Sequence, residues 1–391
     1  MFEEYWVWLQ QVLGYGSSQI THILEEYGDA KSFYDAPDEE KAKRCFLTKK
    51  QFKKLHSVSR RTVYSIIKDC KKNNINIITP DSEVYPELLK NICDPPTVLY
   101  HKGNFFDFNK TVCITIVGPR YPTEYGKKLA HIVSGTLSEC GCTVVSGGAI
   151  GIDKASHIGA LDKGNPTVAV LGCGILNGYL KENKDLRQQI SENGCLLSEY
   201  PPRASASKGS FPVRNRILSG LSLGTVVVEA PKISGALITA RHANEQGRDV
   251  FAVPGRPTDI NYVGTNLLIQ DGAKPLLSVN DILNEYIGIY DNIVLCKNKQ
   301  INVTENIDNT PKNIKNNTEK LQENTANVSI SEKAVSIFNV INNDTFTTDD
   351  IVDLTGLEVS TVITALLELE INGFIKSAAG GFYERTHNGG N

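Results

Sequence analysis

Residues 111 to 285 alternate between two hydrophobic patterns, and this alternation limits the possible folds more than any other feature of the sequence. Short runs rich in β-branched residues are typical of strands buried on both faces of a parallel sheet. Between them lie longer stretches with apolar residues at helical spacing. Strand, helix and strand joined by short loops predict right-handed crossovers and a doubly wound α/β sheet. The expected strands are Val112–Val117, Thr143–Ser146, Thr167–Leu171, Cys195–Ser198, Thr225–Glu229 and Asp249–Val253, with helices near 124–139, 151–163, 183–192, 212–222 and 235–246.

The segments on either side differ from this region in composition and spacing. The break at Gly14-Tyr15-Gly16 is either a tight helix connection or a helix-hairpin-helix turn that offers backbone N–H groups to phosphate. An Asn-rich stretch further on has too few apolar residues to bury a core. The predicted organisation is a small helical domain, SAM-like or helix-hairpin-helix-like, at 1–75, a connector packing on the central domain at 76–110, an extended Rossmann-like domain at 111–290, a flexible linker at 297–328 and a winged-helix-like domain at 331–385.

The charge of the chain is distributed unevenly. The formal net charge is −3, from 41 Lys and Arg against 44 Asp and Glu. Residues 41 to 72 contain twelve Lys or Arg and one acid, Asp69, so the remaining residues are strongly acidic in sum. This basic block either contacts a polyanion such as nucleic acid or is a solvated Lys-rich helix face.

Composition excludes several classes of protein. Apolar residues make up 40% and charged residues 22%, as in ordinary globular proteins, and no apolar run is long enough to span a membrane. The N-terminus lacks the basic region of a secretory signal. The nine cysteines are scattered without a C-x-x-C pair, so we expect reduced thiols, a cytoplasmic location and no metal site.

Three expected strands end in Gly-rich loops: Gly118-Pro119-Arg120, Gly147-Gly148 leading to Asp153, and Gly172-Cys173-Gly174. Glycine lets the backbone approach a ligand closely, and the N-terminus of a following helix favours an anion. Loops at neighbouring strand ends would line one crevice. The loops therefore predict a phosphate-binding groove that includes Gly118, Arg120, Gly147 and Gly148, although tight strand-to-helix turns also require glycine.

The stretch from Arg203 to Arg216 is basic, and no acid occurs from Pro201 to Leu223. Lys208, Arg214 and Arg216 can neutralise phosphates, and the ring of Phe211 can stack on a base, which contributes roughly 1–3 kcal/mol per base. A cationic groove with an aromatic platform is what single-stranded nucleic acid requires. The alternative is that Phe211 is a core residue and that Arg214 and Arg216 pair with Glu199 or Glu229.

A nucleotide-processing enzyme on a related Rossmann fold, such as a phosphoribohydrolase, is the competing functional hypothesis. It needs a pair of carboxylates near the Gly-rich loops, and Asp153 and Glu229 are the obvious candidates. No P-loop motif G-x-x-x-x-G-K-[ST] occurs. P-loop ATP hydrolysis therefore has no support.

A series of ordered motifs spans residues 115–277, and the segment Tyr85-Pro86 with Asp94-Pro95-Pro96 precedes it. With these motifs the sequence resembles the DNA-processing protein A family, also called DprA or Smf. The motifs are Val117-Gly118-Pro119-Arg120, Ser146-Gly147-Gly148-Ala149-x-Gly151-Ile152-Asp153, Ala169-Val170-Leu171-Gly172-x-Gly174, Leu197-Ser198-Glu199, Phe211-Pro212-x-Arg214-Asn215-Arg216, Ser234-Gly235-x-Leu237-Ile238-Thr239-Ala240, Val253-Pro254-Gly255 and Gly264-Thr265-Asn266-x-Leu268-Ile269.

The resemblance implies a protein that binds single-stranded DNA without hydrolysing anything, so we expect no catalytic residue, no cofactor and no metal. Family members shield incoming single-stranded DNA and bring it to a RecA-type recombinase during natural transformation. A third hypothesis is a structural partner of that recombinase whose DNA contact is incidental. Their homodimers form through the late Rossmann region, and their winged helix is an accessory module. Here the expected recognition helix, Val359–Ile371, has two acids and no Lys or Arg, so a protein contact is as consistent with it as a DNA contact. The resemblance places the basic pocket at Arg120, Lys181, Lys208 and Arg214, the stacking platform at Phe211 and the dimer interface at Leu267, Leu268 and Ile269.

Overall fold

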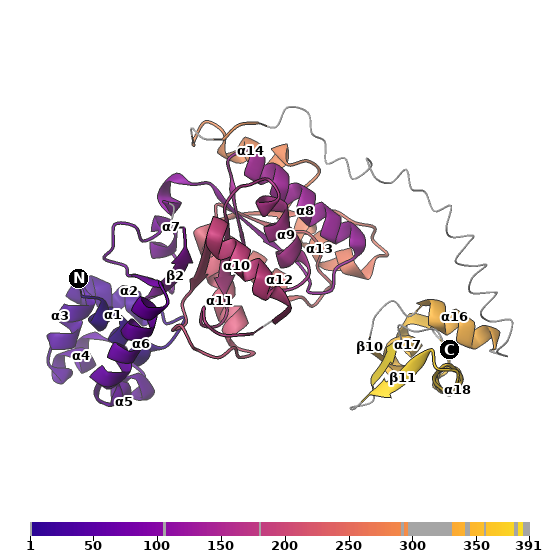
Figure 1. Cartoon of the computed structure of the whole chain (residues 1–391), viewed down its shortest axis with the longest axis horizontal. Coiled ribbons are helices and arrows are strands. Elements are labelled where there is room, and N and C mark those ends of the chain that lie inside the picture. The colour runs from indigo at the N-terminus through magenta and orange to yellow at the C-terminus, as the bar shows by residue number, and fades with distance from the viewer. Residues whose placement is uncertain are drawn as a thin grey trace. The chain divides into compact units, whose positions relative to one another are not determined.

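The computed structural model divides the chain into two compact units, Met1–Val303 and Thr304–Asn391. Figure 1 shows the elements of both. The residues that the structure describes are 2–104, 107–179, 181–290, 293–295, 331–340, 345–355, 357–378 and 382–385.

In the described part of the first unit, one sheet of nine strands forms the centre (Figure 1). The strands are β1 (Asn76–Ile78), β2 (Leu99–Gly103), β3 (Cys113–Val117), β4 (Thr143–Ser146), β5 (Thr167–Leu171), β6 (Cys195–Ser198), β7 (Gly224–Val227), β8 (Asp249–Ala252) and β9 (Lys274–Pro275). Their order is β1-β2-β6-β5-β4-β3-β7-β8-β9. The strands from β3 to β9 pair in parallel, whereas β1 pairs with β2 and β2 with β6 in antiparallel fashion.

The prediction of a doubly wound, mostly parallel sheet is confirmed, because the strand order runs outward from β3 to β6 and then returns to β7. The six expected strands correspond to β3 through β8; β4, β5 and β6 have the predicted ends, and the ends of β3, β7 and β8 differ by one or two residues. The structure adds β1 and β2, which extend the sheet at one edge. The sequence of this connector showed only extended character, because pairing with β6 requires residues about a hundred positions away in the chain.

Helices cover both faces of the sheet. In β3, Ile114 and Ile116 pack with α8 and α9 on one face, whereas Cys113 and Val117 pack with α11 and α12 on the other, since successive side chains of a strand alternate. The helices and 3-10 turns of this region are α7 (Glu87–Lys90), η1 (Phe108–Lys110), α8 (Glu124–Glu139), α9 (Ile152–Leu161), η2 (Lys181–Asn183), α10 (Lys184–Asn193), α11 (Ser210–Leu221), α12 (Gly235–Glu245), η3 (Ile260–Tyr262), α13 (Val263–Gln270) and α14 (Asn280–Tyr286).

The N-terminal helices share a core with the sheet. Trp6 and Leu9 belong to the same buried apolar cluster as Tyr100 of β2 and Leu171 of β5. Within this region the side chain of Gln10 donates to the backbone carbonyl of Glu199 at 2.9 Å and accepts from the hydroxyl of Tyr100 at 2.9 Å. These contacts fix the N-terminal helices on the sheet. The helices are α1 (Glu3–Leu13), α2 (Gln19–Tyr27), α3 (Ala30–Asp35), α4 (Asp38–Arg44), α5 (Lys49–Ser57) and α6 (Arg60–Lys72).

The turn at Gly14-Tyr15-Gly16 faces the central sheet. The N–H of Gly16 donates to the Glu199 carboxylate at 3.3 Å, and the rings of Tyr15 and Tyr200 lie 4.4 Å apart between centroids. Gly16 has a φ of +65°, a conformation that glycine adopts without strain. Because its N–H already has a partner within the protein, the structure favours an ordinary helix connection over a phosphate-binding turn.

The second unit has the winged-helix architecture that the sequence predicts. A core that includes Ile337, Phe346, Leu366 and Ile375 joins its helices to its sheet. The strands lie in the order β10-β12-β11, and β11 and β12 form an antiparallel hairpin. The elements are α16 (Glu332–Val340), β10 (Thr345–Thr347), α17 (Thr348–Thr355), α18 (Val359–Ile371), β11 (Ile375–Ala378) and β12 (Phe382–Arg385).

The remaining features of the structure concern membrane-spanning helices, metal-ligand clusters and the state of the cysteines. In the part of the chain that the structure describes, no helix combines the length and apolar character needed to cross a bilayer, and no three His, Cys, Asp or Glu side chains gather as metal ligands. Cys140 is disulfide-bonded, so the expectation of reduced thiols is wrong for this residue. The cysteines that are free thiols are Cys45, Cys70, Cys93, Cys113, Cys142, Cys173 and Cys195.

Candidate nucleic-acid interface

The three Gly-rich loops meet at the carboxyl edge of the sheet. Gly118 follows β3, Gly147 follows β4 and Gly172 follows β5, and these strands are direct neighbours. The strand order reverses between β3 and β7, and doubly wound sheets bind ligands outside the carboxyl ends of their strands near such a reversal. The fold therefore brings together the loops that the sequence predicts to form one crevice.

Packing within the protein explains why these positions are glycine. A Cβ atom at Gly118 would lie 2.5 Å from Cγ1 of Ile152, and one at Gly147 would lie 2.5 Å from Oδ2 of Asp153. Both distances are far inside van der Waals contact. Gly148 has a φ of +67°, where a side chain would be strained. Contact between the backbone of Gly118, Gly147 or Gly148 and a phosphate stays a prediction.

Phe211 lies at this edge, at the start of α11, and its ring is partly buried. The ring packs on the Gly172 backbone, where a Cβ atom would lie 2.7 Å from its Cδ1. The Arg120 guanidinium lies over the ring, 5.4 Å from the centroid, within the range of a cation–π contact. Phe211 is therefore not sealed in the core, and a cation stands beside it.

The sequence analysis assigned no role to Tyr179, whose ring is a second neighbour of Phe211. The two ring centroids lie 5.2 Å apart and the planes are inclined by 40°. Tyr179 comes from the loop after β5, two residues before Lys181 in the chain. The sequence does show an aromatic residue in a Gly-rich loop at a strand end, which could have marked Tyr179 as a candidate. Only the fold shows that this loop meets α11.

Arg120 and Lys208 carry free positive charge at this edge. Both side chains are exposed, and neither forms an ion pair with a carboxylate of the described residues. Lys208 lies in the loop that leads into α11, three residues before Phe211. We define the Phe211 site as Arg120, Tyr179, Lys208 and Phe211. Its combination of unpaired cations and partly exposed rings suits the phosphates and bases of an unpaired strand.

Arg214 lies beneath this surface. Its side chain is 5% exposed and donates to the carbonyls of Gly147, at 2.7 Å, and Val170. Burial lowers the pKa of Arg214, while the nearby Asp153 carboxylate opposes that effect. The guanidinium thus ties α11 to the ends of β4 and β5. Its Nε has no hydrogen-bond partner among the described residues, so the predicted DNA contact of Arg214 stays a prediction.

Arg216 occupies a buried ion-pair network. It is 2% exposed, and its guanidinium lies 2.7 Å from the Glu199 carboxylate and 2.9 Å from that of Asp94. The sequence left this pairing with Glu199 open as the alternative to DNA contact. Residues two apart on a helix differ by about 200° in direction, so α11 points Arg214 and Arg216 to different sides. The Phe211 site is therefore defined without Arg216.

Lys181 begins the turn η2, but its side chain lies outside the described residues. The same turn is fastened to the Gly-rich edge by Asn183, whose buried amide donates to the carbonyl of Gly148 at 3.1 Å. This contact brings the backbone of η2 to the loop after β4. The predicted DNA contact of Lys181 stays a prediction.

The two carboxylates that an enzyme would require are engaged by different partners. Glu229 is fully buried and accepts hydrogen bonds from the Thr123 N–H and the Tyr262 hydroxyl, both at 3.0 Å. Asp153 is buried, accepts from the Ala149 N–H at 3.2 Å and lies near Arg214. Neither carboxylate is exposed to a substrate. This arrangement does not favour the nucleotide-processing hypothesis.

The burial of His157, on α9 below the site, predicts a pH dependence of the protein's stability. Burial and the charge of Arg214 lower the pKa of His157 to about 3. Because the unfolded state takes up the proton near pH 6.5, the stability that neutral His157 contributes is complete above that pH and is lost as the pH falls toward 3. We expect a loss of about 2 kcal/mol of unfolding free energy between pH 7 and pH 5 that is absent in His157→Gln. Urea denaturation of the wild type and of His157→Gln at both pH values measures the free energy of unfolding. Identical pH dependences of the two proteins would contradict the prediction.

The predicted interface residues lie on α13. Leu267 is 40% exposed, whereas Leu268 packs against the apolar cluster beneath α12. Ile269 is partly buried. Ile260, in the preceding turn η3, is 66% exposed. The helix thus presents Leu267 outward, while Leu268 packs into the fold.

Comparison with known proteins identifies the family. The family model of DNA recombination-mediator protein A matches residues 76–287, more than half of the chain. This chain belongs to the DprA/Smf family. The model of the DprA winged helix domain matches residues 322–381. The resemblance inferred from the motifs is therefore confirmed.

Two curated relatives illustrate how much of the DprA/Smf family pattern the chain contains. Protein Smf of Synechocystis sp. is 35% identical over 332 residues, which are 82% of this chain and 83% of that protein. DNA processing protein DprA of Bacillus subtilis is 43% identical over 215 residues, which are 55% of this chain and 72% of that protein. The similarity thus extends over most of the length of both relatives.

Two solved DprA structures resemble the fold. The crystal structure of DprA from Streptococcus pneumoniae has a TM-score of 0.63 and 34% identity, and covers 71% of this chain and 95% of that one. The structure of DprA from Helicobacter pylori has a TM-score of 0.50 and 30% identity, and covers 55% of this chain and 97% of that one. The Helicobacter pylori work describes a unique single-stranded DNA binding mode of that protein.

Proposed function

We propose that this DprA/Smf family member is a recombination mediator that binds single-stranded DNA at the Phe211 site. The observation that supports the proposal best is the placement of the exposed Arg120 over the partly exposed ring of Phe211, with Lys208 three residues before that ring. Cations neutralise the phosphates and the ring stacks on a base of any identity. The single-stranded DNA binding described for the Helicobacter pylori relative supports single-stranded DNA as the ligand.

The biological role we propose follows the family. The protein protects incoming single-stranded DNA and loads a RecA-type recombinase onto it in the cytoplasm during natural transformation. Membership of a family of recombination mediators supports this role. It requires binding rather than catalysis, and the engagement of Asp153 and Glu229 within the protein is consistent with a non-enzymatic protein.

A titration of labelled oligothymidylate at several salt concentrations tests the binding proposal. Lys and Arg displace counterions from phosphates, so the logarithm of the affinity is expected to fall linearly with the logarithm of the salt concentration. A duplex of equal length serves as the comparison and is expected to bind more weakly, because its bases are not available for stacking. Equal affinity for the duplex would count against the Phe211 site.

The surface of the winged helix suits contact with a protein better than contact with DNA. Its helix α18 contains Glu368 and Glu370 and no Lys or Arg. Glu368 accepts hydrogen bonds from the backbone and hydroxyl of Ser331, both at 2.6 Å. The same helix exposes apolar side chains at intervals of four residues, which suits a protein partner better than a phosphate backbone. These exposed residues are Val359, Ile363, Leu367 and Ile371.

We propose that α13 mediates a homodimer. Leu267→Arg places a charge on the outward face of α13 and is expected to convert the dimer to a monomer, because an unpaired charge buried in an interface costs several kcal/mol. Val84→Arg, which changes another exposed apolar side chain in the connector, is the matched control. Sedimentation velocity measures the oligomeric state of both variants. A Leu267→Arg protein that remains dimeric would show that α13 is not the interface.

A further inference from the structure

Helix α6 carries a row of exposed cations interrupted by one exposed ring. Arg61, Tyr64, Lys68 and Lys71 follow one another at intervals of three and four residues, which places them on one face of the helix. All four side chains are exposed, and Tyr64 is 70% exposed. An exposed aromatic ring between cations is unusual for a face that only needs to be solvated. We call these four residues the α6 face.

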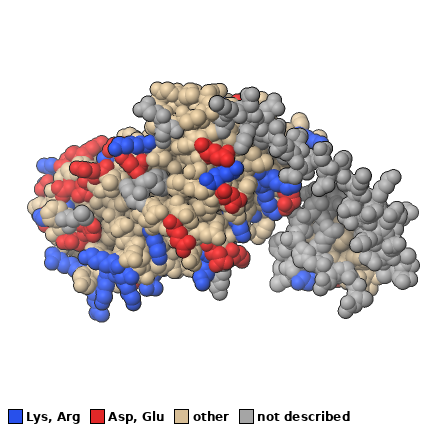
Figure 2. Space-filling view, turned by 45° about the horizontal axis from the view of Figure 1, so that its top comes forward, with Lys and Arg blue, Asp and Glu red and all other residues tan. Residues whose placement is uncertain are grey.

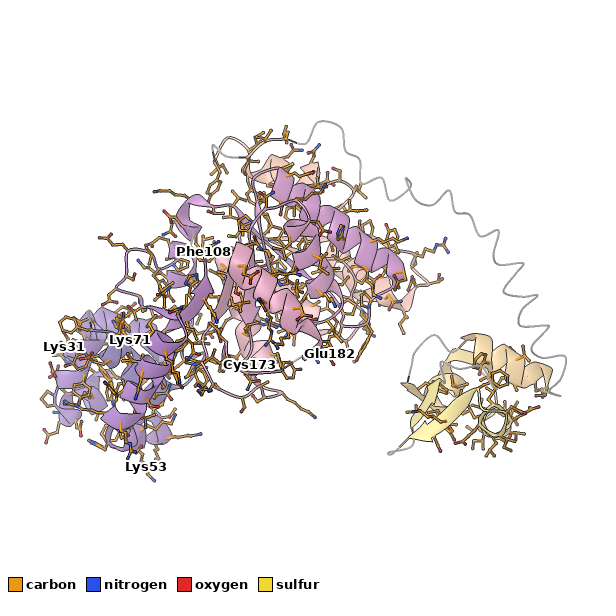
Figure 3. All side chains as sticks on the ribbon, viewed as in Figure 1. Lys31, Lys53, Lys71, Phe108, Cys173 and Glu182 are labelled. Atoms are coloured by element: carbon orange, nitrogen blue, oxygen red, sulfur yellow. The ribbon has the colours of Figure 1, made fainter. Side chains whose placement is uncertain are left out.

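The cations of the α6 face are not neutralised within the described residues: Arg61, Lys68 and Lys71 form no ion pair with a carboxylate there. Arg44, in the same basic block, differs because it lies 3.5 Å from Glu26 and 3.3 Å from Glu40. In Figure 2 the Lys and Arg side chains of the N-terminal helices gather on the lower side, apart from the acidic side chains above them. Lys71, labelled in Figure 3, lies in the last turn of α6.

The position of α6 links its exposed face to the Phe211 site. The one acid of the helix, Asp69, pairs with Arg203 at 2.8 Å. Arg203 begins the loop that carries Lys208 and leads to Phe211. An exposed ion pair of this kind contributes little to stability, but it shows that α6 and this loop are adjacent. The loop that carries Lys208 and leads to Phe211 thus begins beside α6.

We propose that the α6 face is a second contact surface for single-stranded DNA, reached by the same strand that occupies the Phe211 site. The proposal rests on the proposed function, because it extends the path of the same ligand. Tyr64 stacks on an unpaired base, and Arg61, Lys68 and Lys71 contact the phosphates on either side. Duplex DNA fits this surface less well, because its bases are stacked on one another and cannot cover a ring. A helix of 13 residues is about 20 Å long, so α6 spans several nucleotides.

Oligonucleotide length separates the two surfaces. An oligothymidylate of about 6 nucleotides occupies the Phe211 site alone, whereas one of about 20 nucleotides reaches α6 as well. We expect Tyr64→Ala and Lys68→Glu each to weaken binding of the long oligothymidylate about fivefold or more and to leave the short one unchanged. Tyr64→Phe retains the ring and is expected to bind both as the wild type does. Fluorescence anisotropy measures each affinity, and thermal unfolding confirms that each variant is folded.

Lys43→Glu is the matched control, because Lys43 is an exposed lysine of the same basic block on α4 and forms no ion pair with a carboxylate that the structure describes. Unchanged binding of the long oligothymidylate by both α6 variants would overturn the proposal and leave the block as a solvated surface. An equal loss for the two lengths, or a loss confined to duplex DNA, would also overturn it. The proposed function is tested separately, since it fails if Phe211→Ala binds the short oligothymidylate as tightly as the wild type.

Discussion

Arg120→Glu is expected to weaken the binding of single-stranded DNA on the order of 10- to 100-fold. Arg120 is exposed, has no carboxylate partner in the described part of the chain and lies 5.4 Å from the centre of the Phe211 ring. A hydrogen bond to a charged group contributes roughly 1.5–3 kcal/mol, and the substitution also places a negative charge beside the phosphates. The slope of log affinity against log salt is expected to decrease by about one, since one phosphate contact is lost.

The matched control for this prediction is Lys110→Glu. Lys110 is 85% exposed and lies just before β3, at the opposite end of the strand from Arg120. The two proteins undergo the same kind of charge reversal, so a general electrostatic effect would weaken both. We expect Lys208→Glu to behave like Arg120→Glu, and Phe211→Ala to lose roughly 1–3 kcal/mol per stacked base. Wild-type binding by Arg120→Glu and Lys208→Glu would rule out the Phe211 site.

Arg216→Ala is expected to lower the free energy of unfolding by about 3–5 kcal/mol, because it leaves the buried Glu199 carboxylate without its counter-charge. Burial by itself lowers the pKa of Arg216, but Glu199 and Asp94 raise it above its usual value, so the guanidinium stays charged in the folded protein. After the substitution, Glu199 retains the Gly16 N–H at 3.3 Å as its remaining side-chain partner among the described residues. Urea denaturation measures the effect.

Arg203→Ala supplies the contrast for the stability measurement. It removes another arginine from an ion pair, but Arg203 is 64% exposed and its partner Asp69 is 29% exposed. Exposed pairs contribute about 0–1 kcal/mol, so this variant is expected to unfold almost as the wild type does. If the two variants were equally stable, the Arg216 network would not be what fixes the N-terminal turn and Asp94 to the central sheet.

The positions of the strands and helices of the central region follow from the sequence because they depend on neighbouring residues. The run Thr167–Leu171 is β-branched and apolar on both faces, and it forms β5 with the predicted ends. The helix expected near 124–139 forms as α8, where the Thr123 side chain accepts from the Gly126 N–H as an N-terminal cap. Strand β2 was not predicted, because its antiparallel pairing with β6 is set by a distant segment rather than by its own pattern.

The candidate site was predicted in part. Arg120 lies over the ring of Phe211, because parallel strands place their following loops at one edge, and Lys208 precedes that ring by three residues in the chain. The sequence could not distinguish Arg214 from Arg216, since both lie in the same basic stretch. It also gave no reason to join Tyr179 to Phe211 or α6 to the loop at Arg203, because these contacts connect segments that are 32 and 134 residues apart.

The amino-acid sequence by itself determined the alternation of strands and helices, the glycines at the strand ends and the family to which the chain belongs. These properties depend on local spacing and on motifs that the chain order preserves. Only the tertiary structure decided which charges are free. A guanidinium is available to DNA when no carboxylate from elsewhere in the fold reaches it, and the Glu199 and Asp94 carboxylates reach Arg216, whereas among the described residues none reaches Arg120.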